Sequence, residues 1–257
     1  RIAANCYMMD ATRVITAGAV DMGEKPSVIS AIAKYHMTER ARHCVNDAMD
    51  IHGGKGICLG PNNFMGRAYQ QMPVAITVEG ANILTRSLII FGQGAIRCHP
   101  YVLREMRAAK DPDRAAASVE FDDAFTSHIG HTLSNGVRAF VHGITSSRLG
   151  QVPRDGAPET RHYYRFASRM AAAFAFLADV SMLAMGGALK RKEKISGRLG
   201  DVLSMLYLLS ATLKHYEDQG RNKEDIPLIR WVVRDLLYHA QEAIDQILSS
   251  FPIKSVA

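Results

Sequence analysis

Aromatic residues are scarce in this sequence: they make up 7% of the 257 residues, with a single Trp. Prolines number only 9, while unbranched apolar residues such as Ala, Leu and Met are common. Strands are enriched in aromatic and β-branched residues, so this composition favours helices over sheets. Hydrophobic residues make up 47% and charged residues 22%, as in an ordinary globular protein, and the length allows one large domain or two.

Cysteine is also scarce, and no two of the four cysteines form a CxxC pair. Zinc-ligand spacing is therefore absent, and nothing in the sequence requires disulfides, which fits a reducing cytoplasm. No signal peptide is apparent. The chain starts at Arg1 inside what already reads as a helix, so we expect it to be a piece of a longer protein.

Several catalytic and metal-binding motifs are missing. No GxSxG elbow supports serine hydrolase chemistry, and no HExxH pattern completes a metal site. His128 and His131 share a helix face, with Asp122 and Asp123 a turn or more earlier, but this spacing is usually structural. We therefore predict no metal site.

A glycine-dense loop includes Gly53, Gly54 and Gly56 around Lys55. It is not a P-loop, because Lys55 is followed by glycine, and it is not a Rossmann turn, because a helix precedes it. Glycines let a backbone approach a phosphate or a flat ring closely, but a helix end followed by a turn would look the same. Both interpretations remain open on the residues alone.

Negative charge is sparse in the first 110 residues, which hold 13 Lys and Arg against 8 Asp and Glu, whereas the remainder holds 18 and 17. The excess positive charge of +6 therefore lies mostly in the first part. It suits an anionic small molecule better than nucleic acid, because no basic cluster there is interleaved with aromatics.

Helical periodicity recurs along most of the chain and predicts an all-α fold. Residues 73–78 read instead as a buried extended segment or tight turn, and 64–71 is poorly defined. The turn Asp111-Pro112-Asp113 is the best domain boundary, giving domains 1–110 and 111–257, the second a four-helix bundle. The expected helices cover residues 1–22, 27–52, 80–92, 101–110, 113–149, 159–189, 196–219 and 223–250.

Residues 170–189 form an apolar run long enough to raise the question of a membrane span, although Asp179 lies at its middle. A helix that is apolar on nearly all sides is more often the centre of a bundle. The basic run from Lys190 to Lys194 follows. It is either a solvated helix end or a patch for anionic lipid or a phosphate-rich ligand.

Glu79 is the only acidic residue between Ile51 and Arg104, and it stands between an apolar run and an apolar helix. We expect burial to raise the pKa of such a carboxyl group toward the range of a general base. The alternative is an anion in the first turn of a helix, where the macrodipole favours it.

Two motifs in this order, DAMDIHGGKGI and then VEGANILTR, resemble the C-terminal helical domain of acyl-CoA dehydrogenases over residues 1–107. The likeness is strongest to the large bacterial fatty acyl-CoA dehydrogenases of β-oxidation. It implies an all-α fold of two helical bundles, the second being the extra C-terminal region of those enzymes.

The resemblance also implies an activity. Glu79 would be the base that removes the α-proton of a fatty acyl-CoA, which becomes the trans-2-enoyl-CoA while FAD accepts the β-hydride. The glycine loop, Gly80 and Ala81 would contact FAD, although the family usually has Thr at the position of Ala81. In the family, the loop reaches the FAD of a neighbouring subunit.

The expected partners are an electron-transferring flavoprotein and further copies of the chain, in the cytoplasm or at the inner face of the cell membrane. The piece alone is expected to hold no FAD and to be inactive. The alternative function is a non-enzymatic helical module for interaction or membrane docking.

Overall fold

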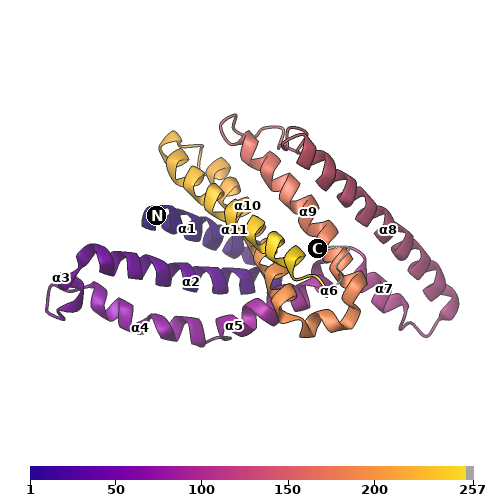
Figure 1. Cartoon of the computed structure of the whole chain (residues 1–257), viewed down its shortest axis with the longest axis horizontal. Coiled ribbons are helices and arrows are strands. Elements are labelled where there is room, and N and C mark those ends of the chain that lie inside the picture. Colours follow the sequence, from indigo (N-terminus) through magenta and orange to yellow (C-terminus); the bar gives the residue numbers. More distant parts are fainter. Residues whose placement is uncertain (253–257) are drawn as a thin grey trace. The chain divides into compact units, whose positions relative to one another are not determined.

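The computed structural model describes residues 1–252, and it is 80% helical with no strand in that part, which confirms the predicted all-α class (Figure 1). The helices are α1 (Ile2–Asp21), α2 (Ser27–His52), α3 (Gly54–Ile57), α4 (Met65–Thr77), α5 (Asn82–Leu84), the π-helix η1 (Thr85–Gln93), α6 (Gly94–Cys98), α7 (Val102–Ala108), α8 (Arg114–Ile144), α9 (Arg161–Met185), the 3₁₀-helix η2 (Gly186–Arg191), α10 (Glu193–Asp218), the 3₁₀-helix η3 (Lys223–Asp225) and α11 (Ile226–Ser249).

Two compact units share these helices. Unit 1 contains residues 1–86 and 207–238, and unit 2 contains residues 87–206 and 239–257. The long helices α10 and α11 therefore contribute residues to both units. The sequence-based division into domains 1–110 and 111–257 stays a prediction.

In unit 1, α1 and α2 form the predicted antiparallel hairpin (Figure 1). Arg1 at the start of α1 pairs with Asp47 near the end of α2. Further along, Arg40 of α2 donates to Asn5 of α1 and to Asp235 of α11, at 2.8 and 2.9 Å. Because Arg40 is largely buried, it fixes three helices by hydrogen bonds as well as by charge.

The segment between residues 64 and 78 differs from the prediction. It forms α4, which packs along α2, and Pro73 lies inside it. An interior proline removes one backbone hydrogen bond but does not end this helix, so the predicted extended segment or tight turn at residues 73–78 is wrong. In the last turn of α4 the Thr77 hydroxyl group donates to the Pro73 and Val74 carbonyls. The glycine loop also contains one helical turn, α3, where none was expected.

In unit 2, α8 and α9 pack side by side (Figure 1). Asp113 begins α8 as its side chain accepts from the backbone N–H groups of Ala115 and Ala116, which confirms the predicted helix start. The core of the unit is a cluster of buried side chains from η1, α9, η2, α10 and α11, together with Phe251, which follows α11. They are Phe91, Leu177, Ala178, Leu189, Ile195, Leu199, Val202, Ala243, Ile247 and Phe251.

The apolar positions predicted for α8 do not join a core. They are exposed, and the helix instead buries Ala117, Ala124, Asn135 and His142. The periodicity correctly predicted a helix here. The prediction of which helix face packs inward is wrong. The exposed positions are Val119, Phe125, Ile129, Leu133, Val137, Phe140 and Ile144.

One helical segment, Arg161–Arg191, has the length and apolarity needed to cross a membrane, and the bent pair Met65–Thr77 and Asn82–Cys98 passes the same test together. Asp179 lies in the middle of the first segment. Its carboxylate is buried and hydrogen-bonded to His99 and Thr132 of the same unit. This pairing is what the central helix of a packed bundle needs.

Candidate functional site

The turn between α4 and α5 places Glu79 in an unusual backbone conformation. Its φ angle is +54°, which few residues other than glycine adopt, and Gly80 follows at +86°. Strain of this kind costs of the order of 1–3 kcal/mol and tends to occur at functional sites.

The structure corrects both expectations for the surroundings of Glu79. Thr77 is the last residue of α4, and it and the turn residues Val78, Glu79 and Gly80 that follow are all exposed. The expected burial of the carboxylate is therefore wrong for this chain. The first-turn alternative is also wrong, since Ala81 caps α5 and Glu79 precedes the cap.

Lys34 of α2 holds the turn in place. Its ammonium group donates to the Gly80 carbonyl and to the Asn82 side chain, both at 2.7 Å. Asn82 is buried, and its amide group donates to Thr38 and Glu39, both at 2.9 Å. The strained backbone beside Glu79 is thus fixed by polar contacts to α2, and Glu79 itself has no hydrogen bond or ion pair within residues 1–252.

The glycine turn lies beyond the other end of α4. Asn63 organises it by donating to the carbonyls of Lys55 and Gly56 and by accepting from the N–H groups of Met65 and Gly66. A pocket of about 570 Å³ borders this turn, with His52, Lys55, Gly56 and Phe64 among its lining residues.

The three glycines of the turn differ in their surroundings. A Cβ added at Gly53 or Gly54 would meet no atom within 4 Å, so the backbone there is open to a ligand. A Cβ at Gly56 would lie 3.2 Å from the Met49 sulfur, so this glycine allows the turn to pack on α2. Gly53 also has a φ of +53°, which glycine adopts without strain.

Glu79 and the glycine turn lie at opposite ends of α4 (Figure 1). A helix of 13 residues is about 20 Å long, so the two features do not form one site within a single copy of the chain.

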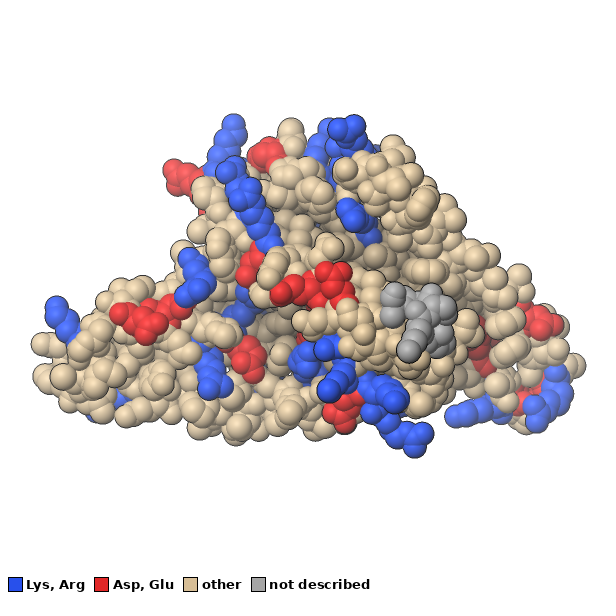
Figure 2. Space-filling view, in the orientation of Figure 1, with Lys and Arg blue, Asp and Glu red and all other residues tan. Residues whose placement is uncertain are grey.

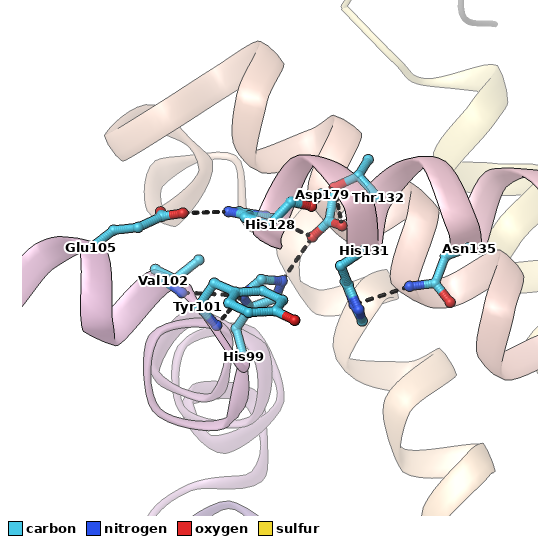
Figure 3. Close-up of polar contacts among 9 residues, drawn as sticks. All are labelled: His99, Tyr101, Val102, Glu105, His128, His131, Thr132, Asn135 and Asp179. Atoms are coloured by element: carbon cyan, nitrogen blue, oxygen red, sulfur yellow. Dashed lines mark hydrogen bonds and ion pairs between the residues drawn. The ribbon is translucent and has the colours of Figure 1, made fainter. Parts of the chain in front are cut away.

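A second polar group, which the sequence did not reveal, lies in unit 2 (Figure 3). Asp179 of α9 accepts from His99 Nε2 at 2.9 Å and from Thr132 of α8 at 2.7 Å. His128 Nε2 lies 3.5 Å from the same carboxylate, and His128 Nδ1 contacts Glu105 of α7 at 2.8 Å. The result is a chain of carboxylates and imidazoles that joins α7, α8 and α9.

The contacts within this group of residues shift the pKa values of its members. Burial alone would raise the pKa of Asp179, but hydrogen bonds from His99 and Thr132, together with the charges of His99 and His128, hold this pKa below its usual value. Burial lowers the pKa of His131, and Asp179 only partly opposes the shift. His131 Nε2 contacts the Asn135 amide nitrogen at 3.0 Å, which fits an imidazole that accepts a hydrogen bond there.

His99, His128 and Asp179 each offer a ligand atom within 4.8 Å of the others and could hold a metal ion. However, His99 Nδ1 accepts from the backbone N–H groups of Tyr101 and Val102, so its proton belongs on Nε2, where it points at Asp179. A metal would have to displace that proton, so the geometry favours a hydrogen-bonded network.

The sequence predicted a structural role for His128 and His131, but it did not indicate the partners of His128. The actual partners are 23 to 51 residues away along the chain, and no local spacing indicates them.

Two family models match the chain. "Acyl-CoA dehydrogenase, C-terminal domain" matches residues 1–92, and "Acyl-CoA dehydrogenase, C-terminal, bacterial type" matches residues 96–257. A similar solved structure is an acyl-CoA dehydrogenase from Bacillus anthracis complexed with FAD, with a TM-score of 0.71 and 13% identity over 98% of this chain. At that identity the likeness shows the fold, and the chain spans 41% of the length of that protein.

Proposed function

Because the chain belongs to the acyl-CoA dehydrogenase family, as its motifs predicted, we propose that the full-length protein oxidises the α,β-bond of a fatty acyl-CoA with Glu79 as the base. The observation that carries this proposal is the backbone of Glu79. A strained turn that is fixed by Lys34 and Asn82, and whose carboxylate has no partner within residues 1–252, suits a group that must meet a substrate.

In this reaction the Glu79 carboxylate accepts the α-proton of the thioester. The N–H of the same residue donates to the thioester carbonyl, which makes the α-proton more acidic. The exposure of Glu79 leaves the carboxylate accessible from outside this chain. Substrate and the remainder of the enzyme would cover it and exclude water, which a carboxylate base needs in order to act near neutral pH.

FAD is the proposed cofactor, and the open side of the glycine turn fits it. Gly53 and Gly54 would admit a flat or phosphorylated group to their backbone, beside the pocket of about 570 Å³. Gly56 would shape the turn, and Gly80 and Ala81 would contact the cofactor near Glu79. Bound FAD supplies the acceptor for the β-hydride of the substrate.

The separation of the two features along α4 supports a homo-oligomer. Each FAD would then contact the glycine turn of one copy of the chain, while Glu79 of another copy would act in the reaction at that FAD. The electron-transferring flavoprotein partner, the role in β-oxidation and the cytoplasmic location with contact at the inner membrane face are further parts of this proposal. So are the inactivity and lack of FAD expected for residues 1–257 alone.

The test replaces the base while keeping its shape. Glu79→Gln in the full-length protein is expected to lower kcat by about 10²–10⁴-fold, the usual contribution of a general base. The flavin absorbance of the purified variant should be unchanged. Glu24→Gln, at another exposed carboxylate in unit 1, is the matched control and should retain activity. Near wild-type turnover in Glu79→Gln would refute the assignment.

A further inference from the structure

A groove of about 790 Å³ runs through unit 2, among α6, α7, α8, α9 and η2. Its volume lies within the range of pockets that bind small molecules. Apolar side chains form most of its walls. They include the buried side chains Phe91 and Leu189, and also Val102, Met106 and Val180.

The rim of this groove is apolar and exposed. Leu183 of α9 is 90% exposed, Leu133 of α8 is 65% exposed and Ile129 is 47% exposed. Large aliphatic side chains gathered at the mouth of an apolar groove indicate a surface that a ligand covers. The groove is thus able to take an apolar chain along its length.

Charge is distributed unevenly around the groove. The paired carboxylates of Glu105 and Asp179 lie on the wall made by α7, α8 and α9, whereas Lys190 lines the groove at η2. Lys190 begins a run of exposed cations, and Figure 2 shows Lys and Arg side chains gathered over the orange segment around η2 of Figure 1. The other cations of the run are Arg191, Lys192 and Lys194.

The helix dipoles account for only part of this run. Lys190 and Arg191 lie in the last turn of η2, where cations are favoured. Lys192 directly follows η2. Lys194 lies in the first turn of α10, the positive end of that helix, next to Glu193, whose negative charge is favoured there.

We propose that the groove binds a long-chain fatty acid, with the chain along the apolar wall made by α7, α8 and α9 and the carboxylate toward Lys190. The walls and the rim supply apolar contacts to the acyl chain of the ligand. The cations favour a negatively charged head group. The carboxylates of Glu105 and Asp179 repel such a head group, so the ligand has one orientation. The groove is lined by residues of unit 2, whereas Glu79 belongs to unit 1, and no residue of the groove takes part in the proposed reaction.

The experiment measures binding to the full-length protein by isothermal titration calorimetry, with ligands below their micelle concentrations. Hexadecanoate is expected to bind, and hexadecyltrimethylammonium, which has the same chain and the opposite charge, to bind at least tenfold more weakly. Leu183→Glu should weaken hexadecanoate about tenfold or more, since it removes apolar wall and adds repulsion. Lys190→Glu should weaken hexadecanoate by roughly three- to tenfold and strengthen the cationic ligand.

The controls make the same changes outside the groove. Leu149→Glu and Lys110→Glu alter exposed residues of unit 2 that do not line it, and both should bind hexadecanoate as the wild type does. Circular dichroism verifies the fold of each variant. If Leu183→Glu fails to fold, the proposal is tested by Lys190→Glu and by the preference for hexadecanoate over hexadecyltrimethylammonium.

Titration with hexadecanoyl-CoA distinguishes a free fatty acid from an acyl-CoA as the ligand of the groove. A more than tenfold preference for hexadecanoyl-CoA that Leu183→Glu removes would assign the groove to acyl-CoA and overturn the free acid. Absence of hexadecanoate binding, or binding that both groove variants leave unchanged, would also overturn the proposal. Turnover of acyl-CoA is independent of either result, so the proposed function is tested separately by Glu79→Gln.

Discussion

Helix α11 buries its periodic apolar side chains, whereas α8 exposes them. In α11, Ile229, Val232 and Leu236 are at most 1% exposed. In α8, Val137 is 63% and Phe140 is 68% exposed. Both helices show the same spacing of apolar residues in the sequence, and both form as expected.

The difference shows that periodicity identifies a helix without identifying the face that packs. The inner face of α8 is made of small and polar residues, such as Ala124 and Asn135, which let it approach α9 closely. Its contact with α9 includes the Thr132–Asp179 hydrogen bond. We therefore expect α11 to depend on apolar packing, and α8 to depend more on polar pairing.

The largest effect is expected at Leu236 in α11. Leu236→Ala removes a side chain that is 1% exposed and leaves a cavity, which should lower the free energy of unfolding by about 2–5 kcal/mol. Urea unfolding followed by circular dichroism measures it. A loss below about 1 kcal/mol would show that α11 is not packed more tightly than α8, and the comparison would fail.

A smaller effect is expected at Asp179, which holds α8 to α9. Asp179→Asn keeps the shape but weakens the contacts with His99, His128 and Thr132, and should cost about 1–3 kcal/mol at pH 7. The pKa of Asp179 is lowered in the folded state, so its contribution to stability is present above the usual Asp value of about 3.9 and is lost as pH falls through the folded pKa.

The measurement is urea unfolding of both proteins from pH 7 downward. The difference in unfolding free energy should stay nearly constant to about pH 5 and shrink below about pH 4. Asp123→Asn, at an exposed position of α8, is the control and should show a much smaller difference. If the difference in unfolding free energy between the two proteins increased at low pH, the assigned pairing of Asp179 with His99 and Thr132 would be contradicted.

The sequence predicted the helices and missed what depends on distant contacts. The hairpin of α1 and α2 and the Asp113 cap follow from local patterns, so they were predictable. The Pro73-containing α4 was not, because packing on α2 maintains a helix that local propensity opposes. The Asp179 network joins three helices, and no spacing reveals it.

The candidate site also has features that the sequence could predict and features that it could not. Glu79 and Gly53, Gly54 and Gly56 could be singled out from residue type and order, and their roles stay predictions. The exposure of Glu79 was not predictable, because apolar neighbours in sequence do not surround a side chain in a turn. The positive φ angle of Glu79 also left no signal, since glycine is the residue expected there.

The smallest effect, and the sharpest test of the comparison, is expected at Phe140 on the outer face of α8. A buried phenylalanine replaced by alanine costs about 3–5 kcal/mol, but Phe140 is 68% exposed, so Phe140→Ala should change the unfolding free energy by no more than about 0.5 kcal/mol. The measurement is made beside Leu236→Ala under identical conditions. If Phe140→Ala costs more than 2 kcal/mol, the outer face of α8 must be covered in solution, and the contrast with α11 disappears.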